Sequence, residues 1–158
     1  MATKKADPSA EQNICVNRQA RHNYFIDEVF EAGLVLVGSE VKSLRDGKAN
    51  LLDSYARIHK GEAFLVNCHI SAYAGANQFN HEPTRLRKLL LHEREIERLT
   101  GKTKEKGLTV VPLRMYFKNG RAKVELGLAR GKKNYDKRET LKRHEAAREM
   151  DRSMRARR

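Results

Sequence analysis

The sequence predicts a mainly β fold, an antiparallel barrel with two or three helices and a disordered basic C-terminal tail. Short segments of alternating apolar and polar residues are joined by turn-forming Asn-Gly and Lys-Gly pairs, which is typical of antiparallel sheets. Two helix-forming segments lie between these strands, and the end of the chain is rich in Lys and Arg. This combination fits a small barrel of the oligonucleotide-binding kind, and a mixed α+β sandwich is the alternative.

Length and composition limit the number of domains and the class of protein. The chain has 158 residues, a net charge of +13 and 39% hydrophobic residues, which is enough for one compact core. We divide it into a flexible N-terminus (residues 1–12), a barrel domain (13–130) and a basic tail (131–158). Its longest apolar runs, of about five residues, are far shorter than a membrane helix requires, and no apolar signal core is present. Two isolated cysteines indicate a reducing environment. We therefore expect a soluble, cytoplasmic protein.

The strongest strand signal is a hairpin that turns at Asn119-Gly120, the preferred pair for a two-residue turn. The alternation of apolar and polar residues assigns one face of its two strands to the core. The other face is assigned to a partly solvent-exposed surface of cations and an aromatic ring. The predicted core residues are Leu113, Met115, Phe117, Val124, Leu126 and Leu128, and the predicted surface residues are Arg114, Tyr116, Lys118 and Lys123.

Further segments bring the expected number of strands to at least five. A weaker hairpin turns near Lys60-Gly61. Before it, the run from Tyr24 to Val37 reads as extended, and Gly33 is expected to break or bulge it. These strands, with the Asn119-Gly120 hairpin, are expected to form the wall of the barrel.

Two helices are expected. The first follows Gly38, where Ser39 can cap the backbone and Glu40 sits favourably against the helix dipole, and Gly47 would end it. The second begins near residue 92, with glutamates toward its start and lysines toward its end. Ile96 and Leu99 would face inward.

More than half of the excess charge lies in the last 29 residues, the tail together with Arg130. Residues 130–158 contain 12 Lys or Arg and 5 Asp or Glu, a net charge of +7. From residue 136 onward the only large apolar side chains are Leu141, Met150 and Met154. Burying each contributes about 1.5 to 3 kcal/mol, whereas ordering each residue costs about 1 to 2 kcal/mol. The tail is therefore predicted to be disordered in the free protein and to become helical on a polyanionic partner, the alternative being a solvated tail with no specific partner.

The motifs of common enzymes and metal sites are absent from the sequence. Three His-Glu pairs lack the second histidine of a zinc site, since Arg85, Ile96 and Arg148 stand at the required positions. No phosphate-binding glycine loop precedes a lysine and a hydroxyl residue. Cys68 and His69 would point to opposite faces of a strand, so Cys68 is expected to be a buried small hydrophobe. We expect no catalysis, no metal and no cofactor.

Two basic clusters indicate RNA binding. Residues 17–25 interleave cations, amides and aromatic rings, and residues 85–88 form a second basic group. Cations neutralise phosphates, while a ring can stack on an unpaired base. Composition alone leaves a ribosomal protein, an RNA chaperone and a reader of tRNA-like folds all open.

Several ordered motifs resemble the SsrA-binding protein family, the small protein B of bacterial ribosome rescue. They are NRQARHNYFIDEVFEAGLVLVGSEVKSLRDGKANLLDSY, NCHISAY, RLRKLLLH and PLRMYFKNGRAKVELGLARGKKNYDKR, which together span residues 17–138. The resemblance implies an oligonucleotide-binding-type barrel that binds transfer-messenger RNA at its tRNA-like domain. It also implies delivery of that RNA to stalled 70S ribosomes in trans-translation. Our default expectation is a monomer that does not associate with membranes.

The resemblance also implies a set of RNA-binding residues: Asn17, Arg18, Arg21, His22, Tyr24, Glu31, Lys42 and Leu91. The cations among them would meet phosphates, the two rings would stack or bond near bases, and Asn17 and Glu31 would bond to ribose hydroxyls or loop bases. Glu31 has the alternative role of ordering the neighbouring cations, and Tyr24 and Leu91 that of packing.

In the tail, the resemblance implies a segment that approaches the decoding centre, followed by a helix along the empty message channel. The implied contact residues are Gly131, Lys132, Lys133, Tyr135, Asp136, Lys137 and Arg138. A vacant channel exposes rRNA phosphates, so a basic segment would gain its helix only where message is missing. One departure is Ala146, which stands where many relatives have Trp, so any stacking by that indole is absent here.

Overall fold

The structure, a computed structural model, describes residues 11–105 and 107–157. Most of the predicted flexible N-terminus, residues 1–10, lies outside them. In chain order the elements are β1 (Gln12–Val16), α1 (Arg18–Asn23), β2 (Tyr24–Leu34), α2 (Gly38–Arg45), β3 (Ala49–Asn50), β4 (Tyr55–His59), β5 (Glu62–Val66), β6 (His69–Ile70), the 3₁₀ helix η1 (Ala74–Phe79), β7 (Arg87–Leu90), α3 (Glu93–Thr103), β8 (Leu108–Lys118), β9 (Arg121–Gly131) and α4 (Asn134–Ala156).

The main sheet closes on itself, which confirms the predicted antiparallel barrel. Seven strands pair in the order β1-β8-β4-β5-β7-β2-β9, every pairing is antiparallel, and β8 also pairs with β9. That last pairing joins β9 back to β8, so the ring consists of β8, β4, β5, β7, β2 and β9, and β1 is an extra strand on the edge of β8. Strands β3 and β6 form a separate two-stranded sheet. The ring decides against the sandwich alternative, because a sandwich has two open sheets.

The two hairpins form at the predicted turns. Asn119-Gly120 joins β8 to β9, and Lys60-Gly61 joins β4 to β5. All four turn residues have positive φ, between 49° and 75°, the conformation that a two-residue type I′ turn requires. Val124, Leu126 and Leu128 point into the core as predicted. The turn signals therefore predicted the positions of both turns correctly.

Bulges change which side chains face the core. In β8 the register shifts between Pro112 and Arg114, so Leu113 points away from Met115 and packs in a second cluster with α1. The prediction that Leu113, Met115 and Phe117 share one face was wrong for this reason. In β2 the irregularity lies between Ile26 and Glu28, not at the predicted Gly33.

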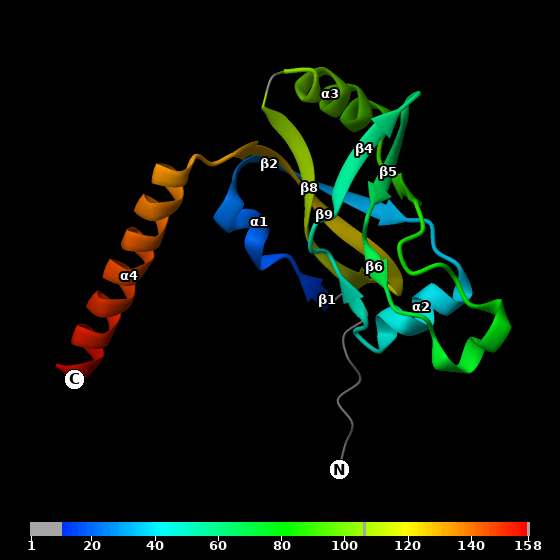
Figure 1. Ribbon diagram of the computed structural model, residues 1–158, viewed down its shortest axis with the longest axis horizontal. Coiled ribbons are helices and arrows are strands. Elements are labelled where there is room, and N and C mark those ends of the chain that lie inside the picture. Colours follow the sequence, from blue (N-terminus) through cyan, green and yellow to red (C-terminus); the bar gives the residue numbers. More distant parts are fainter. Residues whose placement is uncertain (1–10, 106, 158) are drawn as a thin grey trace, which may run out of the picture.

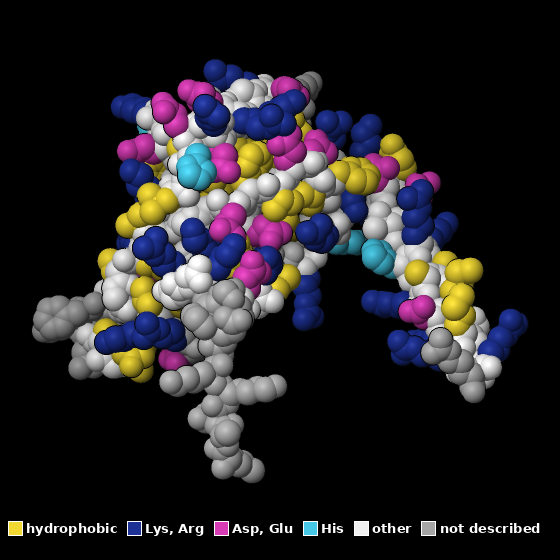
Figure 2. Space-filling view, turned by 180° about the vertical axis from the view of Figure 1, so that it is seen from behind, with side chains coloured by type: hydrophobic (Ala, Val, Ile, Leu, Met, Phe, Trp, Pro, Cys, Tyr) yellow, Lys and Arg dark blue, Asp and Glu magenta, His cyan; other side chains and the backbone are white. Residues whose placement is uncertain are grey.

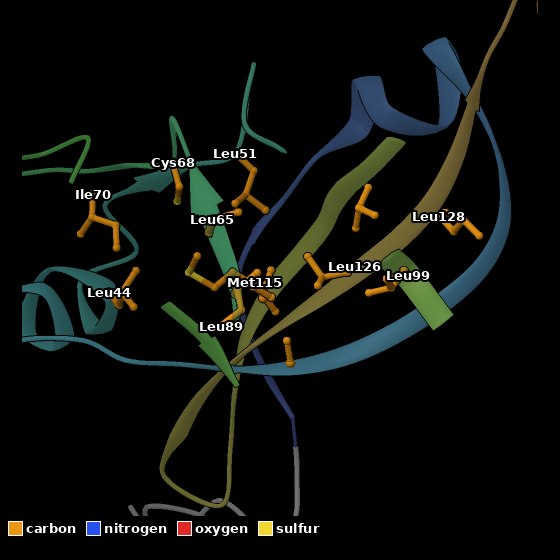
Figure 3. Close-up of a cluster of buried hydrophobic side chains, with 14 residues drawn as sticks. Leu44, Leu51, Leu65, Cys68, Ile70, Leu89, Leu99, Met115, Leu126 and Leu128 are labelled. Carbon is orange, nitrogen blue, oxygen red and sulfur yellow. The ribbon is translucent and has the colours of Figure 1, made fainter. Parts of the chain in front are cut away.

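The core fills the barrel (Figure 3). Its buried members come from α2, α3, the strands β2, β5, β6, β7, β8 and β9, and two loops, and include Leu44, Leu65, Leu89, Leu99 and Leu126. Cys68 is buried there as predicted, and burial raises the pKa of its thiol to about 12, so it stays protonated and unreactive at neutral pH. Leu99 anchors α3 over the barrel, while Ile96 is only half-buried.

Helix α2 lies in the predicted segment but begins earlier, at Gly38. Val37 is its N-cap and gives no side-chain bond. Ser39, the predicted cap, instead donates its hydroxyl to Nδ1 of His81 at 2.8 Å, because Nε2 of that ring donates to the carbonyl of Ile70 at 2.9 Å. A tertiary bond thus replaces the expected local one. Gly47, with φ of +70°, follows the helix end as predicted.

The described residues form four α-helices, where two or three were predicted. The short α1 was not predicted, and α4 occupies most of the tail. Helix α4 projects from the barrel (Figure 1). None of its side chains is buried. It has the helical form that was predicted for the tail when it is bound to a partner. The disorder predicted for the free tail stays a prediction. None of the helices in the described part of the chain is both long and apolar enough to cross a membrane.

Candidate nucleic-acid interface

Asn17 fixes α1 to the barrel. Its Oδ1 accepts a hydrogen bond from the backbone N–H of Ala20 at 3.2 Å, and its Nδ2 donates to the carbonyl of Pro112 at 3.1 Å. The first bond caps α1 and the second ties it to β8. The amide predicted to meet RNA is therefore used within the protein, where it positions its neighbours.

Helix α1 presents cations because its apolar side is held down. Ala20 is buried with Val111, Leu113 and Ala129, and Tyr24 packs against this cluster. The opposite side leaves Arg18 and Arg21 exposed, with His22 half-buried. The structure thus brings five of the predicted residues together on one short helix and its flanks, and it shows that Tyr24 packs, the alternative role.

A groove of about 280 Å³ lies between α1 and the tail helix. Its lining includes three guanidinium groups and two imidazoles and a single acidic side chain; the residues are Arg18, Arg21, His22, Thr140, Leu141, His144, Glu145 and Arg148. A surface with this excess of positive charge favours phosphate. The contribution of α4 was missed by sequence reasoning, although the spacing of His144 and Arg148 puts them on one helical face.

The outer face of β8, β9 and β2 carries a chain of charged contacts. Arg114 donates through Nε to Glu125 at 2.7 Å, and its guanidinium lies 4.3 Å from the ring centroid of Tyr116. The Tyr116 hydroxyl donates to Glu31, which also accepts from Lys118 Nζ at 3.3 Å. Tyr116 is only 1% exposed, so its predicted place on a wet surface was wrong: Arg114 and Glu31 cover it.

Glu31 is held as an anion within this network. The hydrogen bond from Tyr116, followed by that from Lys118, lowers the pKa of Glu31 below its usual value despite partial desolvation. Conversely, burial and then the bond to Glu31 raise the pKa of Tyr116. These contacts allow Glu31 to order the neighbouring cations, and its contact with RNA stays a prediction.

Leu91 lies at a second hollow, a pocket of about 630 Å³. Its lining includes the charged residues Glu31 and Lys123 together with Leu91, His92 and Val41. Glu31 therefore connects the charged sheet face with this pocket. Lys42 lies beyond it on α2, exposed, with Nζ 5.4 Å from the ring centroid of Tyr73.

In the second basic cluster, residues 85–88, the prediction of an RNA-facing surface was wrong for Arg87, whereas Lys88 is exposed and Arg85 partly exposed. Arg87 is 0% exposed and pairs with Glu40, which is equally buried. Its other nitrogens donate to carbonyls, including that of Cys68 at 2.6 Å. Arg85 donates to the same carboxylate at 2.6 Å. Together these bonds fasten α2 to β7, because a carboxylate buried without partners would be costly.

The tail motif begins where β9 ends, at Gly131. The Asp136 carboxylate accepts from the backbone N–H of Lys133 at 3.2 Å and so caps α4. Tyr135 is 61% exposed, and Arg138 is exposed as well. Acidic and basic side chains mix over the barrel, whereas Lys and Arg stand out along the tail helix (Figure 2).

The arrangement of a barrel, a cationic short helix and a basic tail agrees with the comparisons with known proteins. The family model for SmpB protein matches residues 14–156. The chain belongs to the SsrA-binding protein (SmpB) family. Among curated SsrA-binding proteins, that of Geobacter sulfurreducens is 63% identical over 92% of this chain and 95% of its own length. That of Syntrophobacter fumaroxidans is 60% identical over 99% and 98%.

A solved structure agrees with the family and the fold. A chain from a study of tmRNA-SmpB and the center of the bacterial ribosome is 54% identical, with a TM-score of 0.65. The match covers 76% of this chain and 85% of that one. Among the described residues, no three His, Cys, Asp or Glu side chains are grouped so that they could hold a metal ion.

Proposed function

We propose that this chain is the RNA-binding adaptor of bacterial ribosome rescue. It binds the tRNA-like domain of transfer-messenger RNA and accompanies that RNA to stalled 70S ribosomes. The observation that carries the proposal is membership of the SsrA-binding family over nearly the whole chain. The cations of α1, the charged sheet face around Glu31 and the pocket at Leu91 supply the expected RNA contacts. The proposal includes no catalytic step. Because the proposed function is carried out on ribosomes, we expect the protein in the cytoplasm.

The tail has a separate part in this function. Its helix would lie along the empty message channel, with residues 131–138 near the decoding centre. An α-helix rises about 1.5 Å per residue, so the 23 residues of α4 give a rod of roughly 35 Å. Because none of its side chains is buried, its basic side chains remain available for rRNA phosphates. A filled channel would exclude the helix and so report that message is present.

A binding assay at one salt concentration tests the adaptor function. The full chain is titrated with the isolated tRNA-like domain and with a folded RNA of the same length and charge. We expect affinity for the tRNA-like domain to exceed that for the control by at least about 10³-fold, the lower end for specific recognition. Equal affinity for both RNAs would instead indicate a ribosomal protein or a general RNA chaperone.

A further inference from the structure

The junction between the barrel and the tail is short, and its backbone is hydrogen-bonded to the neighbouring part of the barrel. Only Lys132 and Lys133 separate the end of β9 from the start of α4. Gly131 still pairs with Tyr24, and the next backbone N–H, that of Lys132, donates to the carbonyl of Asn23 at 2.9 Å. The sheet ladder therefore continues almost to the first residue of the tail helix, which leaves little freedom in the backbone.

The ammonium group of Lys132 joins three parts of the molecule. It donates to the carbonyl of Arg21 in α1 at 3.0 Å and lies 3.3 Å from the hydroxyl of Thr140 in α4. It also stands 4.9 Å from the ring centroid of Phe25 in β2. A carbonyl in the last turn of a helix favours a cation, so α1 is a suitable anchor.

These contacts occupy most of the donors of the group. An ammonium has three N–H bonds, and two of them point to oxygens here while the Phe25 ring lies close to the charge. Lys132 therefore has at most one N–H left for a phosphate. By contrast, no hydrogen bond or ion pair joins the side chain of Arg138 to another residue in the described part of the chain.

We propose that Lys132 is a positioning residue that sets the direction in which α4 leaves the barrel, instead of a residue that contacts rRNA. By holding α1 and α4 together it also fixes the groove between them. This inference rests on the proposed function, since the direction of the tail matters only if the helix must enter a channel while the barrel holds RNA.

A double-mutant cycle with Lys132→Met and Thr140→Val tests this role in a reconstituted peptide-tagging assay on stalled ribosomes. Methionine keeps the apolar stem on Phe25 and removes the ammonium, and valine keeps the shape of threonine. We expect K132M to lower the tagging rate roughly 10- to 100-fold, since a misplacement of about 1 Å has effects of that size. T140V should lower it less, T140S should restore it, and the double variant should equal K132M.

The salt dependence of ribosome binding separates positioning from contact. A lost phosphate contact reduces the slope of log affinity against log salt by about one, whereas a lost positioning contact leaves it unchanged. K142M is the matched control, because it removes one exposed tail cation outside the junction. It should reduce the slope and act independently of T140V.

The proposal would be overturned by a reduced salt slope for K132M, or by effects of K132M and T140V that multiply. An unchanged tagging rate in T140V would do the same without relying on the folding of K132M. The proposed function fails in a different way, when the wild-type chain neither selects the tRNA-like domain nor supports tagging.

Discussion

The barrel and the tail helix use similar side chains for opposite purposes. In the barrel, Arg87 is fully buried, pairs with Glu40 and gives its remaining donors to backbone carbonyls. In α4, Arg143 and Arg152 are exposed on a helix that buries none of its side chains. A guanidinium stabilises a fold where its partners are internal, and it remains available to an external polyanion where they are not. The contrast predicts that stability resides in the barrel and that the tail contributes only when bound.

Removal of the tail is the largest test of this contrast. A chain ending at Arg130 loses α4 and a net charge of about +6, but no buried side chain. We expect most affinity for the tRNA-like domain to remain and peptide tagging on stalled ribosomes to disappear. Filter binding and a tagging assay measure the two effects. Full tagging by the truncated chain would refute the division of labour.

Breaking the buried ion pair should affect the barrel most strongly. Arg87→Met leaves the Glu40 carboxylate buried beside Arg85 alone, so the free energy of unfolding should fall by about 3 to 5 kcal/mol. Urea denaturation measures this loss. Arg85→Met is the matched control: its side chain is 35% exposed and Glu40 keeps Arg87, so the loss should be only about 1 kcal/mol. Equal losses would show that the two arginines share the carboxylate evenly.

A pair of identical substitutions compares the two regions directly. Leu126→Ala empties a fully buried position in β9 and should lower the free energy of unfolding by about 2 to 5 kcal/mol. Leu141→Ala changes a side chain that is 48% exposed on α4, and its effect should stay within about 0.5 kcal/mol. Thermal melting of both variants tests the expectation. A large loss for L141A would mean that the tail is part of the folded core.

The smallest predicted effect concerns the pH dependence of Glu31. Because the Tyr116 hydroxyl lowers the pKa of Glu31 in the folded state, this bond stabilises the protein above the unfolded pKa. The stabilisation is lost as pH falls through the folded pKa. Tyr116→Phe should therefore cost about 1 kcal/mol at neutral pH and progressively less in acid.

Urea denaturation across this pH range measures the difference between wild type and Y116F. Tyr55→Phe, at a tyrosine that is 39% exposed on β4, is the matched control and should show no such trend. A difference for Y116F that stayed constant with pH would assign the effect to packing alone.

Sequence reasoning was most successful where the signal is local. The positions of both turns were predicted correctly from the Asn119-Gly120 and Lys60-Gly61 pairs, because few residues accept positive φ. The alternating pattern correctly predicted the inward-facing residues of β9, and Leu99 was correctly predicted to face inward on α3. The basic residues of α1 were singled out, although the helix itself was not expected.

The errors have two physical causes. A bulge reverses the alternation in β8, so Leu113 could not be assigned to its face from the pattern alone. Tyr116 and Arg87 carry polar groups that normally face water, and they are buried because Glu31 and Glu40 arrive from elements far away in sequence. Such pairs give no signal until the chain has folded.

The sequence by itself determined the class of fold, the turns, the uneven distribution of charge and the family, since each depends on residues that are near one another or in a fixed order. Only the tertiary structure decided which cations are free. Arg87 is enclosed by Glu40, and Lys132 is taken up by Arg21 and Thr140. The availability of a charge depends on the partners that folding brings within reach, and that is a property of three-dimensional arrangement.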